Sequence, residues 1–304
     1  MHMPAHRSLA ILPLALALAL GLGLPAQAAE VELPHAGLTL NGNLELADGR
    51  SVSDGVVLIT HGTLAHGRME IAQSLQDLLR ERGVSSLAIT LSLGIDRRAG
   101  NYDCSVPHTH RHADAVNEIA AWVGWLKAKG ATSVTVLGHS RGGNQTAWYA
   151  AEHRDPVVKK VVLIAPMTQD AAATAASYQR GFKKDVGPLV EAARKLAASD
   201  AKAMMKPVDI LYCAGTAATA ESFLSYHAHD PHFDTPALVA KTDVPVLVLV
   251  GGADDVSPGL ERAFRPVLTP GRVEVAVVDG ADHFFRDLYA EEIADAVAAF
   301  LGKP

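Results

Sequence analysis

Short apolar runs alternate with amphipathic stretches along most of this chain. Runs rich in Val, Ile and Leu occur at residues 56–60, 86–90, 134–137, 160–164, 244–250 and 273–277. Continuous apolar runs of this length are typical of strands buried on both faces. Apolar residues recur at helical spacing over residues 68–82, 113–129, 144–151 and 290–301. The alternation predicts an α/β fold with a mostly parallel central sheet and helices on both faces.

Three segments depart from this alternation. Residues 38–46 alternate apolar and polar positions around an Asn-Gly pair, which predicts an antiparallel edge hairpin. Residues 91–112 show no period and are rich in Gly, Asp, His and Pro, which is typical of a functional loop or an insertion. Residues 167–234 are rich in Ala, Lys and Ser, have helical periods and show no strand pattern. We interpret them as the main part of a helical cap inserted at about residues 167–240.

The first residues have the features of an export signal. His6 and Arg7 precede an apolar run at residues 9–24, and Ala26-Gln27-Ala28 supplies a small-x-small cleavage pattern. This predicts a signal peptide at residues 1–28 and a mature domain at residues 29–304, which is periplasmic or secreted and has no stable membrane anchor after cleavage. An uncleaved anchor is the alternative, although the run is short for a full span.

The charge and cysteine content indicate which partners and which compartment suit this chain. The formal net charge is −6, the pI is about 6.1, and basic residues are scattered, which argues against a nucleic-acid surface. The two cysteines, Cys104 and Cys213, would lie in an oxidising compartment after export. A disulfide between them is permitted there, and two buried free thiols are the alternative.

The clearest chemical motif lies between the apolar run at residues 134–137 and the helix that follows it. Residues 138–142 read Gly-His-Ser-Arg-Gly and fit the pattern G-x-S-x-G. A sharp turn from strand to helix holds such a serine at its apex, and the glycines remove side chains that would collide there. A tight glycine-rich turn with an incidental serine is the alternative. The segment resembles the nucleophile elbow of the α/β-hydrolase family, with Ser140 as the nucleophile.

Two later turns resemble the other catalytic turns of that family. The strand at residues 244–250 continues into Gly-Gly-Ala-Asp-Asp-Val-Ser-Pro, where Asp254 matches the acid and Asp255 is its rival. The last strand is followed by Asp-Gly-Ala-Asp-His-Phe-Phe, where His283 matches the histidine. The order Ser140, Asp254, His283 is the order found in this fold.

These residues predict a division of roles. Ser140 attacks an acyl carbonyl, His283 takes and returns its proton, and Asp254 orients the imidazole. The oxyanion needs two backbone donors. We expect one from Arg141 at the start of the helix, and the other from Thr63 or Leu64 after the strand at residues 56–60.

Two histidine clusters allow a different chemistry. One comprises His108, His110 and His112, and the other comprises His227, His229 and His232. Three imidazoles on an extended segment are able to bind zinc or copper. No carboxylate spacing fixes such a site, however, and we predict no metal. We expect His108, His110 and His227 to line the substrate pocket above Ser140 instead.

The resemblance covers about residues 56–301 and implies an α/β-hydrolase fold with eight strands, no cofactor and an acyl-serine intermediate. The favoured function is a serine hydrolase that cleaves a carboxylic ester of a small-molecule acyl substrate. The same residues are suited to cleaving an amide, a peptide or a thioester. The alternatives from other classes are a non-catalytic binding protein and a periplasmic metal-binding protein. The cap matches no subgroup, so the resemblance implies no substrate class.

Overall fold

The structure is a computed structural model that describes residue 2 and residues 28–302. Apart from these two positions, the signal peptide predicted at residues 1–28 lies outside the described residues. In the described part of the chain, no helix combines the length and the hydropathy needed to cross a membrane.

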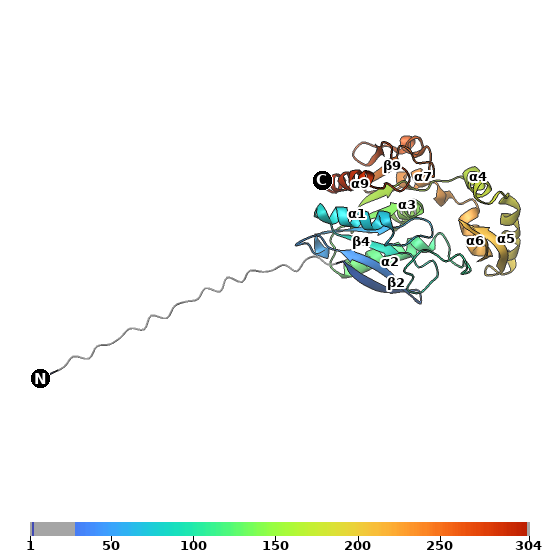
Figure 1. Ribbon diagram of the computed structural model, residues 1–304, viewed down its shortest axis with the longest axis horizontal. Coiled ribbons are helices and arrows are strands. Elements are labelled where there is room, and N and C mark those ends of the chain that lie inside the picture. The colour runs from blue at the N-terminus through green and yellow to red at the C-terminus, as the bar shows by residue number, and fades with distance from the viewer. Residues whose placement is uncertain (1, 3–27, 303–304) are drawn as a thin grey trace.

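A single large sheet organises the molecule (Figure 1). Within residues 28–302 it has eight strands in the order β1-β2-β4-β3-β5-β6-β9-β10. From β4 to β10 all neighbouring strands are parallel, and β1 and β2 are added antiparallel at one edge. The strands are β1 (Ala29–His35), β2 (Leu38–Glu45), β3 (Val56–Thr60), β4 (Ser86–Thr90), β5 (Val134–His139), β6 (Val158–Ile164), β9 (Val246–Gly251) and β10 (Val273–Val278).

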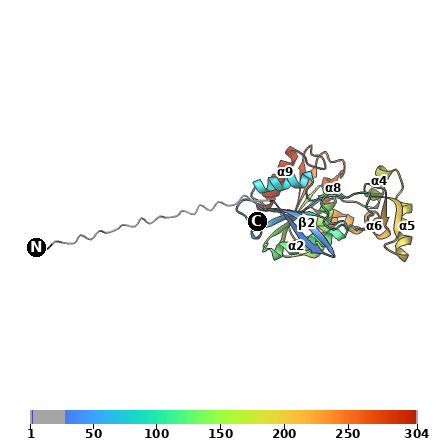
Figure 2. The same cartoon turned by 60° about the horizontal axis from the view of Figure 1, so that its bottom comes forward.

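Helices cover both faces of this sheet. Helices α1 and α9 pack on each other, as do α2 and α3. The views in Figures 1 and 2 place α1 and α9 on one side of the sheet and α2 on the other. The helices of this domain are α1 (Glu70–Glu81), α2 (Asp114–Ala128), α3 (Arg141–His153), α7 (Thr235–Ala240), α8 (Leu260–Phe264) and α9 (Leu288–Gly302).

The apolar runs fix the centre of the sheet. Every residue of β3, β4 and β5 is buried, as the continuous apolar runs predict. Strands β3 and β4 have the predicted bounds, because their runs end abruptly in polar or glycine residues. The predicted fold class is therefore confirmed, including the eight strands.

The edge hairpin is present, but its turn was predicted at the wrong position. Strand β1 pairs with β2 through a turn at Ala36 and Gly37, whereas Asn41 and Gly42 lie inside β2. A Cβ atom on Gly42 would come within 3.0 Å of Leu87 Cδ1. This glycine therefore serves close packing rather than a turn.

The insertion between β6 and β9 forms a cap at one end of the molecule, visible at the right of Figures 1 and 2. It contains α4 (Ala171–Phe182), α5 (Gly187–Ser199), β7 (Met204–Ile210), β8 (Cys213–Thr219) and α6 (Ala220–His227). A hydrophobic core of its own, separate from that of the sheet domain, includes Tyr178, Val190 and Phe223.

Two expectations for the cap need correction. Strands β7 and β8 form an antiparallel ribbon, although the sequence indicated no strand there. Their Ala, Gly, Lys and Pro residues have low β-propensity, so packing against α6 rather than local preference supports the ribbon. In addition, α7 packs on α3 and contributes Leu238 and Val239 to the core of the sheet domain. The cap therefore ends before α7 and not at about residue 240.

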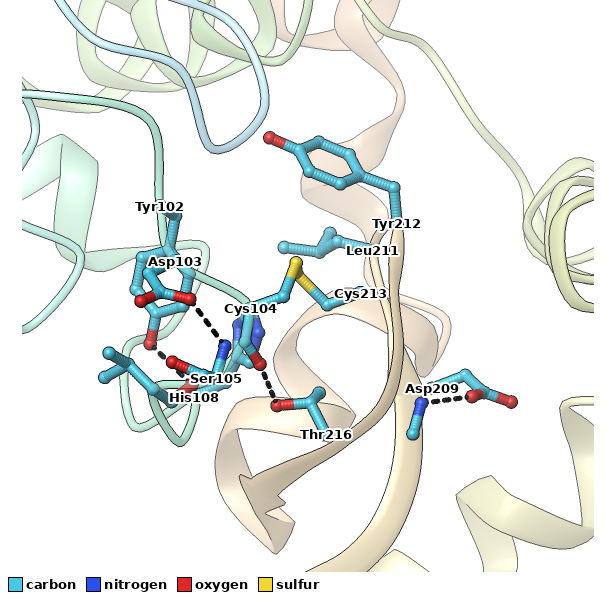
Figure 3. Close-up of a disulfide and its surroundings, with 12 residues drawn as sticks. Tyr102, Asp103, Cys104, Ser105, His108, Asp209, Leu211, Tyr212, Cys213 and Thr216 are labelled. Atoms are coloured by element: carbon cyan, nitrogen blue, oxygen red, sulfur yellow. Dashed lines mark hydrogen bonds between the residues drawn. A yellow bond between two sulfur atoms is a disulfide. The ribbon is translucent and has the colours of Figure 1, made fainter.

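A disulfide attaches the cap ribbon to the long loop at residues 91–113 (Figure 3). Cys104 in the loop and Cys213 at the start of β8 are bonded, with their Cα atoms 5.3 Å apart. The Thr216 hydroxyl donates a 2.6 Å hydrogen bond to the Cys104 carbonyl beside it. The structure thus realises the disulfide alternative for the two cysteines.

Candidate active site

Ser140 lies at a strained turn between β5 and α3. Its φ and ψ are 56° and −123°, a conformation that costs a non-glycine residue about 1–3 kcal/mol. The turn is feasible because Gly142 lacks a side chain: a Cβ atom there would lie 2.2 Å from the His61 carbonyl oxygen. The Gly-His-Ser-Arg-Gly motif therefore forms the tight strand-to-helix turn that its pattern predicts.

A continuous chain of hydrogen bonds links the three side chains singled out from the sequence. Ser140 Oγ lies 2.9 Å from His283 Nε2, and His283 Nδ1 lies 2.8 Å from Asp254 Oδ2. A carboxylate only accepts hydrogen bonds, so Nδ1 carries the proton and Nε2 is free to accept the Ser140 proton. The imidazole and carboxylate side chains are only 4% and 2% exposed, which strengthens the pair electrostatically.

The surroundings of Asp254 keep it ionised and distinguish it from Asp255. Burial alone would raise the pKa of Asp254, but hydrogen bonds from His283 and from the backbone of Ser257 and Val256 outweigh burial and lower that pKa. Asp255, by contrast, is exposed and has no hydrogen-bond or ion-pair partner among the described residues. The geometry therefore favours Asp254 over its neighbour.

His139, immediately before the serine, positions the histidine turn. Its Nε2 lies 2.9 Å from the backbone carbonyl of His283 and donates to it. Burial lowers the pKa of His139 to about 4, so this imidazole is neutral near pH 7. It therefore ties the elbow to the turn that carries His283.

Two backbone N–H groups next to Ser140 are available for an oxyanion. Within the described chain, neither the N–H of Arg141 nor that of Thr63 has a hydrogen-bond partner. Arg141 begins α3, where the helix dipole adds positive potential. Both residues line the cleft that opens above Ser140. The N–H of Leu64, the alternative donor, also lacks a partner, but Leu64 is 3% exposed and is not among the residues that line this cleft.

The cleft has a volume of about 360 Å³ and lies between the sheet domain and the cap. The sheet domain contributes Ser140, His283 and Phe284, and the cap contributes Arg180 and Tyr212. A second cavity, of about 390 Å³, opens at the amino ends of the strands. Its lining contains no histidine that could activate a nucleophile. In open α/β sheets, ligands bind at the carboxyl ends of the strands, where Ser140 lies. We therefore assign the candidate site to the cleft above Ser140.

The predicted substrate-lining role of His108, His110 and His227 is not what the structure shows. Among the described residues that line the cleft, none of these three appears. His108 and His110 are 0% and 2% exposed, and His110 Nδ1 lies 2.7 Å from the Tyr226 hydroxyl. They pack against the cap, because His108 pairs with Ala218 of β8 and His110 contacts Tyr226 of α6.

The two histidine clusters make different contacts. His108 Nδ1 lies 3.1 Å from His110 Nε2, whereas His112 Nε2 donates to Asn144 Oδ1 over 2.7 Å. His232, in the second cluster, stacks on Trp148 with ring centres 3.9 Å apart. No group of three His, Cys, Asp or Glu residues in the part of the chain described here is arranged to hold a metal ion.

Sequence reasoning missed three contributors to the site: His139, Tyr212 and the side chain of Arg141. Tyr212 lies beside the disulfide (Figure 3), and its hydroxyl donates to the Thr63 carbonyl over 3.2 Å. The Arg141 guanidinium donates from Nε to Thr63 Oγ1 over 3.1 Å. His139 and Arg141 stand inside the serine motif, but a motif gives no information about what its variable side chains contact.

Comparisons with known proteins agree with this architecture. A family model described as alpha/beta hydrolase fold matches residues 55–206, which is half of the chain. No curated protein sequence matches the chain significantly. Est1E from Butyrivibrio proteoclasticus is similar in structure, with a TM-score of 0.63 and 19% identity, over 90% of this chain and 97% of that one.

Two further structures have the same fold. The esterase domain of a Rhodothermus marinus protein gives a TM-score of 0.59 at 16% identity, over 90% of this chain and 97% of that one. A monoacylglycerol lipase from Paleococcus ferrophilus gives a TM-score of 0.58 at 19% identity, over 86% of this chain and 98% of that one. Together with the family match, the sheet order and the strand-to-helix serine turn, these likenesses show that the chain belongs to the alpha/beta hydrolase fold family.

Proposed function

We propose that this protein is a serine hydrolase that cleaves a carboxylic ester through an acyl-serine intermediate. The observation that carries the proposal is the hydrogen-bond chain from Ser140 through His283 to Asp254, placed at the floor of a cleft. A serine hydroxyl is a weak nucleophile at neutral pH unless a positioned base removes its proton. This arrangement supplies the base and its orienting carboxylate.

The proposed reaction has two stages. His283 Nε2 takes the Ser140 proton while Oγ attacks the ester carbonyl, and the N–H groups of Arg141 and Thr63 stabilise the oxyanion. The imidazolium then protonates the departing alcohol, which leaves an acyl-serine. Water attacks this intermediate with the same base, and the acid product leaves. Asp254 stabilises the charged imidazole in both stages.

The names of the structural neighbours favour esters. The two neighbours from Rhodothermus marinus and Paleococcus ferrophilus are named as an esterase domain and a lipase, and Est1E has also been described with ferulic acid bound. Amide and thioester cleavage remain the alternatives for the same groups, and a non-catalytic binding protein is the alternative from another class.

Labelling by a fluorophosphonate probe, together with turnover, tests the proposal. The wild-type protein is expected to be labelled covalently, and Ser140→Ala is expected not to be. His283→Ala should lower kcat by about 10⁴-fold or more while the melting temperature changes little. A panel of p-nitrophenyl esters of different acyl length, with matching amides and thioesters, then shows which type of acyl bond the protein cleaves fastest. Equal labelling of Ser140→Ala would contradict the assignment of the nucleophile.

We also propose that the mature protein is periplasmic or secreted, without a stable membrane anchor. The predicted signal sequence and the bond between Cys104 and Cys213 support this, because disulfides persist in oxidising compartments. Cell fractionation with N-terminal sequencing tests it: the mature chain should begin at Ala29 and appear in the soluble exported fraction. A full-length chain that sediments with membranes would contradict it.

A further inference from the structure

The guanidinium of Arg141 is unusual because it is partly buried and has no acidic partner. Nη1 is buried and has no hydrogen-bond partner, and the single side-chain bond is the one from Nε to Thr63 Oγ1. In the described chain, Arg141 forms no ion pair with any carboxylate. Its remaining contact is with the face of Tyr226, whose ring centre lies 5.4 Å from Cζ.

The groups packed near Arg141 do not compensate its charge. His110 and His112 are buried, and burial lowers the pKa of His112 to about 3 and that of His110 well below its usual value. Tyr226 stays protonated because burial raises its pKa. A cation that is partly buried among neutral groups is stabilised when an anion pairs with it. The charge therefore indicates a partner that enters from the cleft lined by Arg141.

Two arginines, Arg141 and Arg180, line the cleft. Arg180 belongs to α4, is exposed, and has no ion-pair or hydrogen-bond partner among the described residues. The residues that line the cleft include no Asp or Glu. The whole chain has a formal net charge of −6, so this local excess of positive charge contrasts with the rest of the molecule. Such a cleft attracts anions from solution.

We propose that the natural substrate of the cleft carries a carboxylate in addition to its ester group, and that Arg141 binds this carboxylate while Arg180 attracts it at the entrance. The proposal rests on the proposed ester hydrolysis. The substrate class is a monoester of a dicarboxylic acid, or an ester whose alcohol or phenol carries a carboxylate. A single guanidinium is suited to a group of one negative charge, to which it donates charge-assisted hydrogen bonds. A phosphate monoester shares the anionic chemistry but carries nearly two charges.

Kinetics on matched substrate pairs test the proposal. Monomethyl glutarate is compared with methyl pentanoate, and 4-carboxyphenyl butanoate with phenyl butanoate, so that the charge lies first in the acyl group and then in the leaving group. For the preferred pair, wild-type kcat/KM should favour the anionic ester by about 30-fold or more. The readout for each variant is the ratio of kcat/KM for the anionic ester to kcat/KM for the neutral one. A substitution that slows both reactions equally leaves this ratio unchanged.

Three variants locate the effect. Arg141→Gln should reduce the ratio by about 30-fold, and Arg141→Lys should reduce it less, because lysine keeps the positive charge and loses the bond to Thr63 that orients the side chain. Arg180→Gln should reduce it by about threefold, and added salt should weaken that effect. Lys195→Gln removes an exposed charge from α5 away from the cleft and serves as the matched control. An unchanged ratio in Arg141→Gln, or the same loss in Lys195→Gln, would overturn the proposal.

Binding without turnover separates this proposal from the proposed function. Glutarate should raise the melting temperature of Ser140→Ala, glutaramide should not, and Ser140→Ala/Arg141→Gln should lose the response. If wild-type protein hydrolyses neutral esters but shows no preference for either charged ester, the carboxylate proposal is wrong and the hydrolase proposal stands. If no ester is hydrolysed, the glutarate response still tests the anion site. Stronger stabilisation by inorganic phosphate than by glutarate would contradict a carboxylate ligand.

Discussion

The sheet domain and the cap contribute to the site in different ways. The sheet domain holds Ser140, Asp254 and His283 just beyond the carboxyl ends of the parallel strands β5, β9 and β10. The cap has a smaller core and reaches the cleft with Arg180 and Tyr212 from α4 and the β7–β8 ribbon. The sheet domain therefore positions the reactive groups, and the cap shapes the cleft through which a substrate reaches them. Four experiments test this contrast.

The largest expected effect is on stability in acid, because several neutral histidines are buried at the carboxyl end of β5, against α3 and at the boundary with the cap. Burial lowers the pKa from the usual 6.5 to about 4 for His108 and His139 and to about 3 for His112 and His227. Below pH 6.5 the unfolded chain binds protons that the folded chain excludes. Stability should therefore fall as pH drops from 6.5 towards 4, by about 1.4 kcal/mol per pH unit for each such histidine.

Glu118 acts in the opposite direction. Burial raises its pKa from 4.5 to about 7, so its contribution to stability decreases as pH rises from 4.5 to 7. One carboxyl group offsets only one histidine. The free energy of unfolding should therefore still increase with pH between about 4.5 and 6.5. Urea unfolding at pH 7.5, 6.5, 5.5 and 4.5 measures this pH dependence. His227→Gln should reduce the slope of the unfolding free energy against pH by the contribution of one proton, about 1.4 kcal/mol per pH unit. A flat profile below pH 6.5 would show that these histidines are accessible to protons in the folded state.

The second effect concerns Asp254, the carboxylate that orients His283 in the sheet domain. Asp254→Asn should lower kcat/KM by about 10³–10⁴-fold, since the amide loses the charge and favours the wrong imidazole tautomer. Asp255→Asn is the matched control and should retain wild-type activity, because Asp255 is exposed and outside the hydrogen-bond chain. Steady-state kinetics on one neutral ester compares them. Equal losses would mean that the two carboxylates share the role.

The third effect concerns the attachment of the cap. The bond between Cys104 and Cys213 joins residues 109 positions apart. Replacing both by serine should lower the free energy of unfolding by about 4 kcal/mol, because the unfolded chain gains conformational entropy when the cross-link is absent. Because the ribbon beside Cys213 lines the cleft through Tyr212, KM should rise more than kcat falls. Denaturation and kinetics of the double variant measure both, and a fall in kcat alone would contradict the proposed division between the two regions.

The smallest effect concerns one contact between the regions. Tyr212→Phe removes the hydrogen bond to the Thr63 carbonyl and leaves the ring in place. Because Thr63 is a proposed oxyanion donor, kcat/KM should fall by about two- to fivefold, with little change in stability since Tyr212 is 54% exposed. Tyr102→Phe, which removes a hydroxyl bonded to the Pro107 carbonyl on the far side of the disulfide, is the matched control and should be kinetically silent. An equal loss in both variants would indicate a general loosening of the loop.

The local pattern was sufficient for the centre of the sheet and for the serine turn, but not for the edge hairpin. The runs at residues 56–60 and 86–90 give the bounds of β3 and β4, because burial on both faces requires continuous apolar residues and leaves a pattern in the sequence. The turn around Ser140 was equally predictable, since its backbone conformation requires glycine at fixed neighbouring positions. The choice of Asp254 over Asp255 needed the structure, because adjacent residues carry the same local signal.

The sequence by itself determined the parallel sheet, the position of the serine turn and the order of the three polar turns around it, because each depends on residues close together in the chain. Only the tertiary structure decided the β7–β8 ribbon, the burial of His108 and His110, the joining of Cys104 to Cys213 and the unpaired charge of Arg141. These features depend on which distant segments pack together. That packing is set by the sum of many weak contacts, and no local pattern records it.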